Sequence, residues 1–516
     1  MATTSDHNVT ETAFDAVKCK LSAATLGYFQ DDFLSCFVAK PTRRIPLIHR
    51  GYYLRHIAID DCVKRFLSSN PDTPLQIVSL GAGFDTLFFR LMAQRVAQPI
   101  RFVEVDCAAI ASAKAEILGR DDTNRTLFAG LRVRRLDANA DASVLVQYEL
   151  PDERSTLSLV SRDLGDTPRL EAAWTACGLD PASPTLVIAE CVVSYLEPSR
   201  GTTLLQSLAR WFHDAAIAMY DPIALDDAFG ATQQQYFAVK GCELRGLQQY
   251  PSARDQMRRL VSEAKWSSCR VVDMNAVFDA CTSAAEKRRL QTLECFDEYA
   301  DWALCNAHYA LSIATIGPSA DRWSQEFCRG RGLFARTFSS NSETLVLRSF
   351  EPQDLRATQK LFQATHLEYS CKAVKKFVFN RVRSGDMADV NASFLAQPRS
   401  HFWVITTTSG DVVACIGIKP FVGAGETAAT TQTAELCRLS VDAAWRRRGL
   451  ASVLVEHLES FAQRAAYDAI RLDTIASMAS AQAFYAACGY VEAAARESFP
   501  GFTLVRFSKS LQAKRQ

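Results

Sequence analysis

The chain has 516 residues, of which 48% are hydrophobic and 22% charged, and its formal net charge is +1. This length exceeds what one hydrophobic core usually organises, so we expect two or three domains. The near-neutral charge gives no electrostatic reason to expect nucleic acid or an anionic membrane as the main partner. The 16 cysteines are scattered singly, without a Cys-x-x-Cys pair, and predict neither a disulfide framework nor a zinc site.

The N-terminal stretch MATTSDHNVTETAFD is polar and acidic, without the basic and apolar regions of a signal peptide. No uninterrupted apolar run approaches the roughly 20 residues that a bilayer-spanning helix needs. We therefore expect a cytoplasmic protein without membrane association.

Strands and helices alternate along the first three-fifths of the chain. Apolar runs predict strands at 75–80, 101–106, 157–164, 184–196 and 215–221. Helical spacing separates these runs, for example at 108–118 and 169–177, and a last strand is expected at 308–317. Such alternation predicts an α/β domain with a mainly parallel sheet that helices cover on both faces.

Polar or glycine residues mark the carboxyl ends of four of these strands. The turn Gly81-Ala82-Gly83 follows the first strand and Asp106 ends the second, while Asp163 and Glu190 end two later ones. Doubly wound sheets bind nucleotide-like ligands at these ends, where a glycine turn presents backbone N–H groups and an acid can take two ribose hydroxyls. The four positions together predict a cofactor site.

The order of the motifs RGYYLR, SLGAG, FVEVD, DL and AECVVSYL resembles that of the leucine carboxyl methyltransferase family, over about residues 15–317. The resemblance implies a Rossmann-like domain that uses S-adenosyl-L-methionine to methylate the C-terminal leucine carboxylate of the protein phosphatase 2A catalytic subunit. The residues that it places at the cofactor are Lys20, Arg55, Gly81, Asp106, Asp163, Leu164 and Glu190. It gives Lys20 and Arg55 a catalytic role beside the substrate carboxylate and makes Tyr195 a candidate substrate-binding residue.

The chemistry agrees with these roles. A carboxylate is already ionised and nucleophilic at pH 7, so the enzyme needs no strong general base and must mainly position its reactants. An arginine fork with a lysine suits this task because both bind carboxylates through charge-assisted hydrogen bonds. By themselves, Lys20 and Arg55 are also compatible with the surface, whereas Glu190 in an apolar strand requires a partner or ligand.

Three alternatives stay open at this point. One branch of the family methylates a carboxyl group on a hypermodified tRNA base and carries a repeat-containing extension; other relatives act on small molecules. This chain is not basic and its extension is an unrelated domain, which favours the phosphatase tail. Alternatively, one of the two domains is a non-catalytic cofactor-binding module.

A polar stretch between residues 318 and 341 predicts the domain boundary. We expect a first domain at 1–330, a linker at 331–343 and a second domain at 344–516. The second pattern comprises a strand and helix from 344, a hairpin at 401–420 and a strand at 433–441. A long amphipathic helix follows, and then a strand, a helix and a strand.

The segment RRRGLA (446–451) fits the pattern Arg/Gln-x-x-Gly-x-Gly/Ala between a strand and a helix, where backbone N–H groups can cradle a pyrophosphate. Together with ELCRLSVD and AFYAACGY it resembles GNAT-type N-acetyltransferases, and the ending PGFTLVRFSKSL is similar to their camello-like branch. The resemblance implies acetyl-CoA bound through Arg446, Gly449 and Ala451.

In the same framework Tyr485 is the general acid for the departing thiolate, and Glu435 is a base for an amine whose identity the sequence does not give. The sequence departs from the family at Met478, where asparagine is often found.

Overall fold

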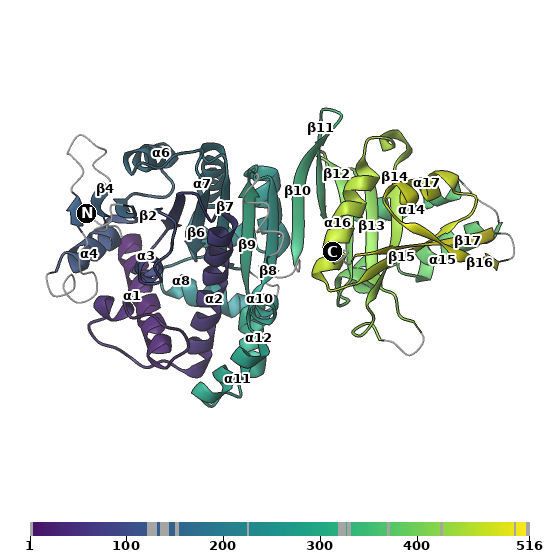
Figure 1. Cartoon of the computed structure of the whole chain (residues 1–516). Helices are drawn as coiled ribbons and strands as arrows, with labels where there is room; N and C mark the ends of the chain where they lie inside the picture. Colours follow the sequence, from purple (N-terminus) through teal and green to yellow (C-terminus); the bar gives the residue numbers. More distant parts are fainter. Residues whose placement is uncertain are drawn as a thin grey trace. The chain divides into compact units, whose positions relative to one another are not determined.

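The computed structural model describes residues 4–120, 132–134, 144–149, 154–223, 227–317, 327, 332–368, 372–423, 427–499 and 502–511. The chain divides into two compact units, Met1–Leu333 and Phe334–Gln516 (Figure 1). Each unit has its own hydrophobic core. The strands of the first unit are β1 (Leu75–Leu80), β2 (Ile100–Asp106), β3 (Arg132–Arg134), β4 (Val144–Glu149), β5 (Thr156–Ser161), β6 (Thr185–Glu190), β7 (Ala215–Pro222), β8 (Ser268–Asp273) and β9 (Tyr309–Ile316).

Helices connect these strands. They are α1 (Thr4–Thr25), α2 (Pro46–Ser69), α3 (Leu87–Ala93), α4 (Ala108–Leu118), α6 (Thr167–Ala176), α7 (Pro198–Trp211), α8 (Ala228–Val239), α9 (Ala253–Arg258), α10 (Met274–Cys281), α11 (Ala284–Leu293) and α12 (Tyr299–Ala307). Short helical turns are η1 (Leu34–Phe37), η2 (Val193–Tyr195), η3 (Arg245–Gln248) and η4 (Arg259–Glu263).

The predicted parallel sheet is confirmed. Strands β5, β2, β1, β6 and β7 pair in parallel in that order. Antiparallel strands extend the sheet on both sides, with β4 and β3 beyond β5, and β9 and β8 beyond β7. Every residue of β1 and of β7 is buried, as expected for strands with both faces covered.

Two predicted strands end earlier than expected. The apolar run at 184–196 continues past β6, but β6 stops at Glu190 because Cys191 adopts a left-handed conformation (φ +56°) and η2 follows. Likewise β5 ends at Ser161, so Asp163 lies two residues beyond it. Hydrophobicity alone does not reveal where a backbone turns away from its neighbours.

The second unit is built on a mainly antiparallel sheet. Its strands are β10 (Leu333–Ser340), β11 (Glu343–Ser349), β12 (His401–Thr407), β13 (Val412–Pro420), β14 (Thr433–Val441), β15 (Ala469–Ile475), β16 (Val491–Phe499) and β17 (Phe502–Ser510). Its helices are α14 (Leu355–Leu367), α15 (Lys372–Ser384), α16 (Leu450–Arg464) and α17 (Ala479–Ala487), with the turns η6 (Pro352–Asp354), η7 (Asn391–Leu395) and η8 (Ala443–Trp445). The pairing order is β10, β11, β12, β13, β14, β15, β17, β16 (Figure 1).

One parallel pair interrupts this sheet. β14 and β15 pair only from Thr433–Ala469 to Glu435–Arg471, although both strands continue for several residues. One core packs on the α16 side of the sheet and another on the α14 and α15 side. Beyond Glu435 and Arg471 the two strands are no longer paired.

The segment expected as a linker at 331–343 contains β10, which pairs with β11 from Ala335 to Ser340. Phe334 and Ala335 are buried, but the following residues break the alternation of apolar and polar side chains. The hydrogen bonds to β11, and not a periodic pattern in the sequence, make this segment a strand.

Within the described residues, no helix is both long and apolar enough to cross a membrane. The cysteines of the described part of the chain are free thiols.

Candidate active sites

The first candidate site lies at the carboxyl edge of the parallel strands. Gly81 follows β1, and Asp106 and Glu190 are the last residues of the two strands that flank it. The N–H of Arg162 donates to the Asp106 carbonyl at 3.0 Å, which places the Asp163 segment next to β2. The four strand-end positions therefore belong to four neighbouring strands.

The glycine turn and Asp106 form one hydrogen-bonded unit. The N–H of Gly83 donates to Asp106 Oδ2 at 2.7 Å and that of Cys107 donates to Oδ1 at 2.7 Å. Burial raises the pKa of the Asp106 carboxyl, although these hydrogen bonds oppose the rise. A carboxylate oxygen can accept more than one hydrogen bond, so Asp106 can also accept from a hydroxyl group.

Gly81 is required by the space around it. Its φ is +58°, and a Cβ at this position would lie 2.5 Å from Cγ2 of Val192 in the loop after β6. The close approach of these two loops keeps the glycine turn next to the segment that carries Glu190.

Buried charges gather beside this turn. Arg55 on α2 donates through Nε to Glu190 Oε2 at 2.5 Å and through Nη2 to the Glu190 carbonyl at 3.3 Å. Lys20 on α1 lies 3.7 Å from Glu190 Oε2 and 3.4 Å from Asp85 Oδ1. Each of these four side chains is 10–15% exposed. We call Lys20, Arg55, Asp85 and Glu190 the charge cluster.

The cations keep the carboxylates ionised. Burial alone would raise the pKa of Glu190, but Lys20 and Arg55 outweigh it and hold the pKa below its usual range. For Asp85, burial is likewise outweighed by Lys20, Arg90 and other cations, so its pKa is strongly lowered. The sequence interpretation gave no role to Asp85; its position in GFDT, directly after the glycine turn, is the signal that could have found it.

Tyrosines surround Arg55. Its guanidinium carbon lies 5.2 Å from the ring centroid of Tyr220 and 5.8 Å from that of Tyr52. Tyr220 stacks on Tyr309 with centroids 5.2 Å apart and planes 8° from parallel. Burial raises the pKa of all three tyrosines, so they are neutral phenols at pH 7. The sequence interpretation missed these aromatic neighbours.

The remaining predicted residues of this site lie outside the charge cluster. Asp163 pairs with Arg200 at 2.7 Å and its side chain is 61% exposed, while Leu164 is buried. Tyr195 ends η2, and its ring packs edge-on against Phe237 with centroids 6.2 Å apart. The buried Leu164 can contact the face of a planar ring, and the exposed Asp163 beside it can accept hydrogen bonds from the polar edge of that ring.

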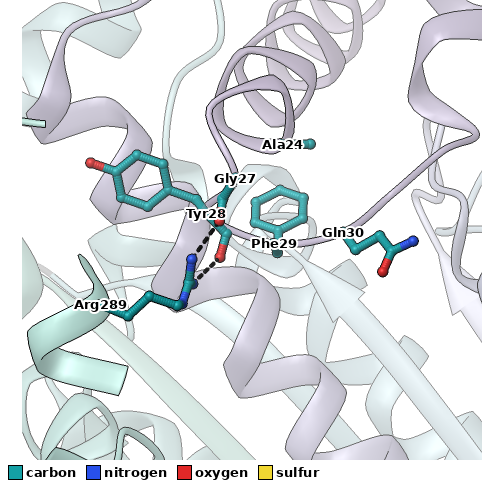
Figure 2. Close-up of a pocket in the computed structure, with 6 residues that line it drawn as sticks. All are labelled: Ala24, Gly27, Tyr28, Phe29, Gln30 and Arg289. Atoms are coloured by element: carbon teal, nitrogen blue, oxygen red, sulfur yellow. Dashed lines mark hydrogen bonds between the residues drawn. The ribbon is translucent and has the colours of Figure 1, made fainter. Parts of the chain in front are cut away.

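A pocket of ≈ 360 Å³ lies elsewhere, at the C-terminal end of α1 (Figure 2). Arg289 donates to the carbonyls of Gly27 at 2.6 Å and Tyr28 at 2.9 Å there. None of the predicted site residues lines this pocket. The Arg289 guanidinium donates its hydrogen bonds to these two carbonyls and to Glu286.

The second candidate site lies where β14 and β15 part. Glu435, the last residue of β14 paired with β15, lies 3.5 Å from Lys419 on β13 and its side chain is 34% exposed. Tyr485 on α17 is buried among Tyr490 and Phe507, and burial raises its pKa. A phenol that stays protonated at pH 7 can act as an acid.

The predicted phosphate cradle opens α16. Gly449 is its N-cap with φ +80°, and a Cβ there would meet no atom within 4 Å, so the space above the helix start is open. Ala451 is half-buried in the first turn of α16. Arg446 donates to both carboxylate oxygens of Glu368 at 2.7 and 2.8 Å. This exposed fork holds an anionic group, and a phosphate presents the same oxygen geometry.

Met478 is the N-cap of α17 and provides no side-chain cap; its Sδ lies 3.8 Å from Thr474 Oγ1.

Known families match both units. Residues 9–209 match the leucine carboxyl methyltransferase family, and residues 367–490 match the acetyltransferase (GNAT) family. These families imply S-adenosylmethionine and acetyl-CoA as cofactors. Residues fitting them are present: an acid bonded to a glycine turn, and a left-handed glycine at an open helix start.

A solved GNAT-family acetyltransferase from Staphylococcus aureus is 17% identical and covers 33% of this chain and 99% of its own, with a TM-score of 0.27.

Several curated relatives match the first unit. The human "tRNA wybutosine-synthesizing protein 4" is 39% identical over 303 residues, but the alignment spans 58% of this chain and only 42% of the relative. The Arabidopsis thaliana "Leucine carboxyl methyltransferase 1 homolog" is 33% identical, with 58% of this chain and 86% of the relative covered. "Leucine carboxyl methyltransferase 1" of Caenorhabditis elegans is 31% identical over 60% of this chain and 92% of the relative. The chain, which also carries a GNAT domain, belongs to the leucine carboxyl methyltransferase family.

Proposed function

We propose that the first unit is an S-adenosylmethionine-dependent carboxyl methyltransferase whose acceptor carboxylate binds beside Arg55 and Lys20. The observation that carries the proposal is the buried charge cluster next to the glycine turn. Two cations and two ionised carboxylates are held together, 10–15% exposed, at the ligand-binding edge of a parallel sheet, and charges perturbed by burial and close partners concentrate at functional sites.

Each residue then has a distinct task. Asp106 accepts the ribose hydroxyls, Gly81 lines the methionine and ribose part of the cofactor, and Asp163 with Leu164 frames the adenine ring. Glu190 holds the amino group at the cofactor's amino-acid end. S-adenosylmethionine supplies an electrophilic methyl group on a sulfonium. Arg55 and Lys20 bind carboxylates and orient the acceptor, which needs no general base because it is already ionised.

For the acceptor we propose the C-terminal leucine carboxylate of the protein phosphatase 2A catalytic subunit, with Tyr195 in the same pocket. Two relatives named leucine carboxyl methyltransferase 1 or its homolog are covered over 86% and 92% of their length, which supports this choice. The test is transfer of label from S-adenosylmethionine to the phosphatase, with and without its terminal leucine. Transfer that ignores removal of the leucine would refute the acceptor.

Replacing Arg55 tests the site itself. Truncating one partner of a buried, hydrogen-bonded charge pair in a binding site costs ~2–5 kcal/mol of binding, so the loss of the contact to the acceptor carboxylate in Arg55→Ala should lower kcat/KM by about 10²–10³-fold. Arg65→Ala is the matched control, because Arg65 lies on the same helix and pairs with Asp61 at 2.6 Å on the partly exposed side. Equal turnover by the two variants would show that Arg55 has no role in the reaction.

A second acceptor has its own support. The human relative named for wybutosine synthesis is 39% identical, more than the two relatives named for leucine carboxyl methylation. A carboxyl group on a hypermodified tRNA base therefore belongs in the same label-transfer assay, beside small carboxylates. Label in tRNA and none in the phosphatase would reassign the acceptor without changing the reaction class.

For the second unit we propose an acetyl-CoA-dependent N-acetyltransferase acting on an unidentified amine. Arg446, Gly449 and Ala451 bind the pyrophosphate, Glu435 receives the amine proton directly or through water, and Tyr485 protonates the leaving thiolate. Calorimetry with acetyl-CoA followed by a panel of amines tests this. Binding without transfer would instead indicate a cofactor-sensing module. We further propose that both reactions take place in the cytoplasm.

A further inference from the structure

The backbone of β14 contains a bulge next to the point where β15 departs. Cys415 pairs with Ser440 and Gly417 pairs with Cys437, so β14 contains one more residue than β13 between these pairs. Within this bulge Arg438 adopts a left-handed conformation (φ +62°). A residue with a Cβ rarely takes this conformation, and it persists only where surrounding contacts impose it.

The contacts that impose it are present on the side chain. Arg438 donates through Nε to Asp386 Oδ1 at 3.1 Å and through Nη2 to Asp386 Oδ2 at 2.8 Å, and both side chains are 10% exposed. Asp386 also faces Lys419 at 3.5 Å and Arg381 at 3.8 Å. A buried bidentate ion pair fixes the direction of the arginine and thereby the dihedral angles of its backbone.

The carbonyl of Arg438 is held as well. It accepts from Cys415 Sγ at 3.5 Å and from Ser440 Oγ at 3.3 Å. Cys415 belongs to the core on the α14 and α15 side, whereas Leu439 packs against the core on the α16 side. Because C=O and N–H of one peptide unit point in opposite directions, the N–H of Leu439 is directed away from the α14 side, beside the gap between β14 and β15.

We propose that Asp386 is a positioning residue that, through Arg438, aims the Leu439 N–H at the carbonyl of a bound acetyl thioester. This inference rests on the proposed acetyl-CoA function of the second unit. Asp386 contacts Arg381, Lys419 and Arg438, and its effect on the thioester passes through Arg438. Its ion pair keeps Arg438 in the strained left-handed conformation. Without that ion pair, the backbone at Arg438 would return to an extended conformation.

Calorimetry of the full chain with acetyl-CoA and with CoA tests the proposal without a known amine. Wild type should bind acetyl-CoA roughly five- to tenfold more tightly than CoA, the worth of one well-placed hydrogen bond. Asp386→Ala should abolish that ratio while leaving CoA affinity unchanged, and Asp386→Asn serves if the alanine variant does not fold. Glu459→Ala is the control, because it removes an ion pair between Glu459 on α16 and Lys509 on β17.

Rescue separates positioning from general destabilisation. Glycine adopts positive φ without strain, so adding Arg438→Gly to Asp386→Ala should restore the preference for acetyl-CoA. A preference that survives Asp386→Ala, or a double variant that stays without preference, overturns the role of Asp386. A wild type that binds neither CoA nor acetyl-CoA overturns the proposed acetyltransferase function and this inference with it.

Discussion

Replacing Gly81 by alanine tests how the cofactor turn is built. Left-handed backbone costs a residue with a Cβ ~1–2 kcal/mol, and overpacking a filled site costs a further ~1–3 kcal/mol. At Gly81 both terms apply, since the new Cβ would lie 2.5 Å from Val192 Cγ2. At Gly83, with φ +56°, the nearest atom is Ala13 Cβ at 3.7 Å, an ordinary contact, so only the backbone term applies.

Thermal unfolding of the first unit measures the difference. The unit spans Met1–Leu333. With an unfolding entropy of roughly 2.1 cal/mol/K per residue, each kcal/mol lowers its Tm by about 1.4 °C. We therefore expect Gly81→Ala to lower Tm by ~3–7 °C and Gly83→Ala by only ~1.5–3 °C. The KM for S-adenosylmethionine should also rise more in Gly81→Ala, because Val192 lies two residues beyond Glu190.

A double-mutant cycle identifies the cause. Val192→Ala removes the two methyl groups that the new Cβ would meet, so Gly81→Ala in that background should lose less stability than in wild type. The coupling energy should be ~1–3 kcal/mol, matching the overpacking term. Equal Tm losses at the two glycines, or a coupling energy of zero, would refute the reasoning.

Two further predictions concern protonation. Asp221, which accepts from Ser194 Oγ at 2.8 Å, has its pKa raised by burial to about 6, so the stability it contributes is present below pH ~4 and is lost as pH rises through about 6. Denaturant unfolding between pH 4 and 7 should show a smaller fall for Asp221→Asn than for wild type; parallel profiles would contradict this. Tyr485→Phe should lower kcat for acetyl transfer by ~10²–10⁴-fold without changing acetyl-CoA affinity, and an unchanged kcat would exclude Tyr485 as the acid.

Much of the first site could be predicted from the sequence because several of its residues lie at the ends of predicted strands. Asp106 and Glu190 are the last residues of β2 and β6, and parallel strands bring their carboxyl ends to one edge of the sheet. Lys20 and Arg55 came from resemblance to a family, since nothing in their own helices distinguishes them from surface cations. Their roles depend on α1 and α2 reaching the strand edge.

Asp85 shows the limit of this approach. It follows the glycine turn in the sequence, but its partner Lys20 lies 65 positions earlier, and Arg55 meets Glu190 across 135 positions. Local patterns carry no information about such pairs. Of the tyrosines around Arg55, Tyr52 lies three positions before it on the same helix, α2, whereas Tyr220 and Tyr309 are contributed by β7 and β9.

The sequence by itself determined the alternation of strands and helices, the parallel sheet of the first unit and the bounds of β14. These features follow from short-range periodicity, which each segment expresses regardless of its neighbours. Only the tertiary structure decided that β6 stops before Cys191, that β10 is a strand, and that Arg438 bends β14. β10 is fixed by its pairing with β11, the end of β6 by the left-handed conformation of Cys191, and the bend at Arg438 by its ion pair with Asp386, 52 positions away. Such contacts and backbone constraints override the local preference of the backbone.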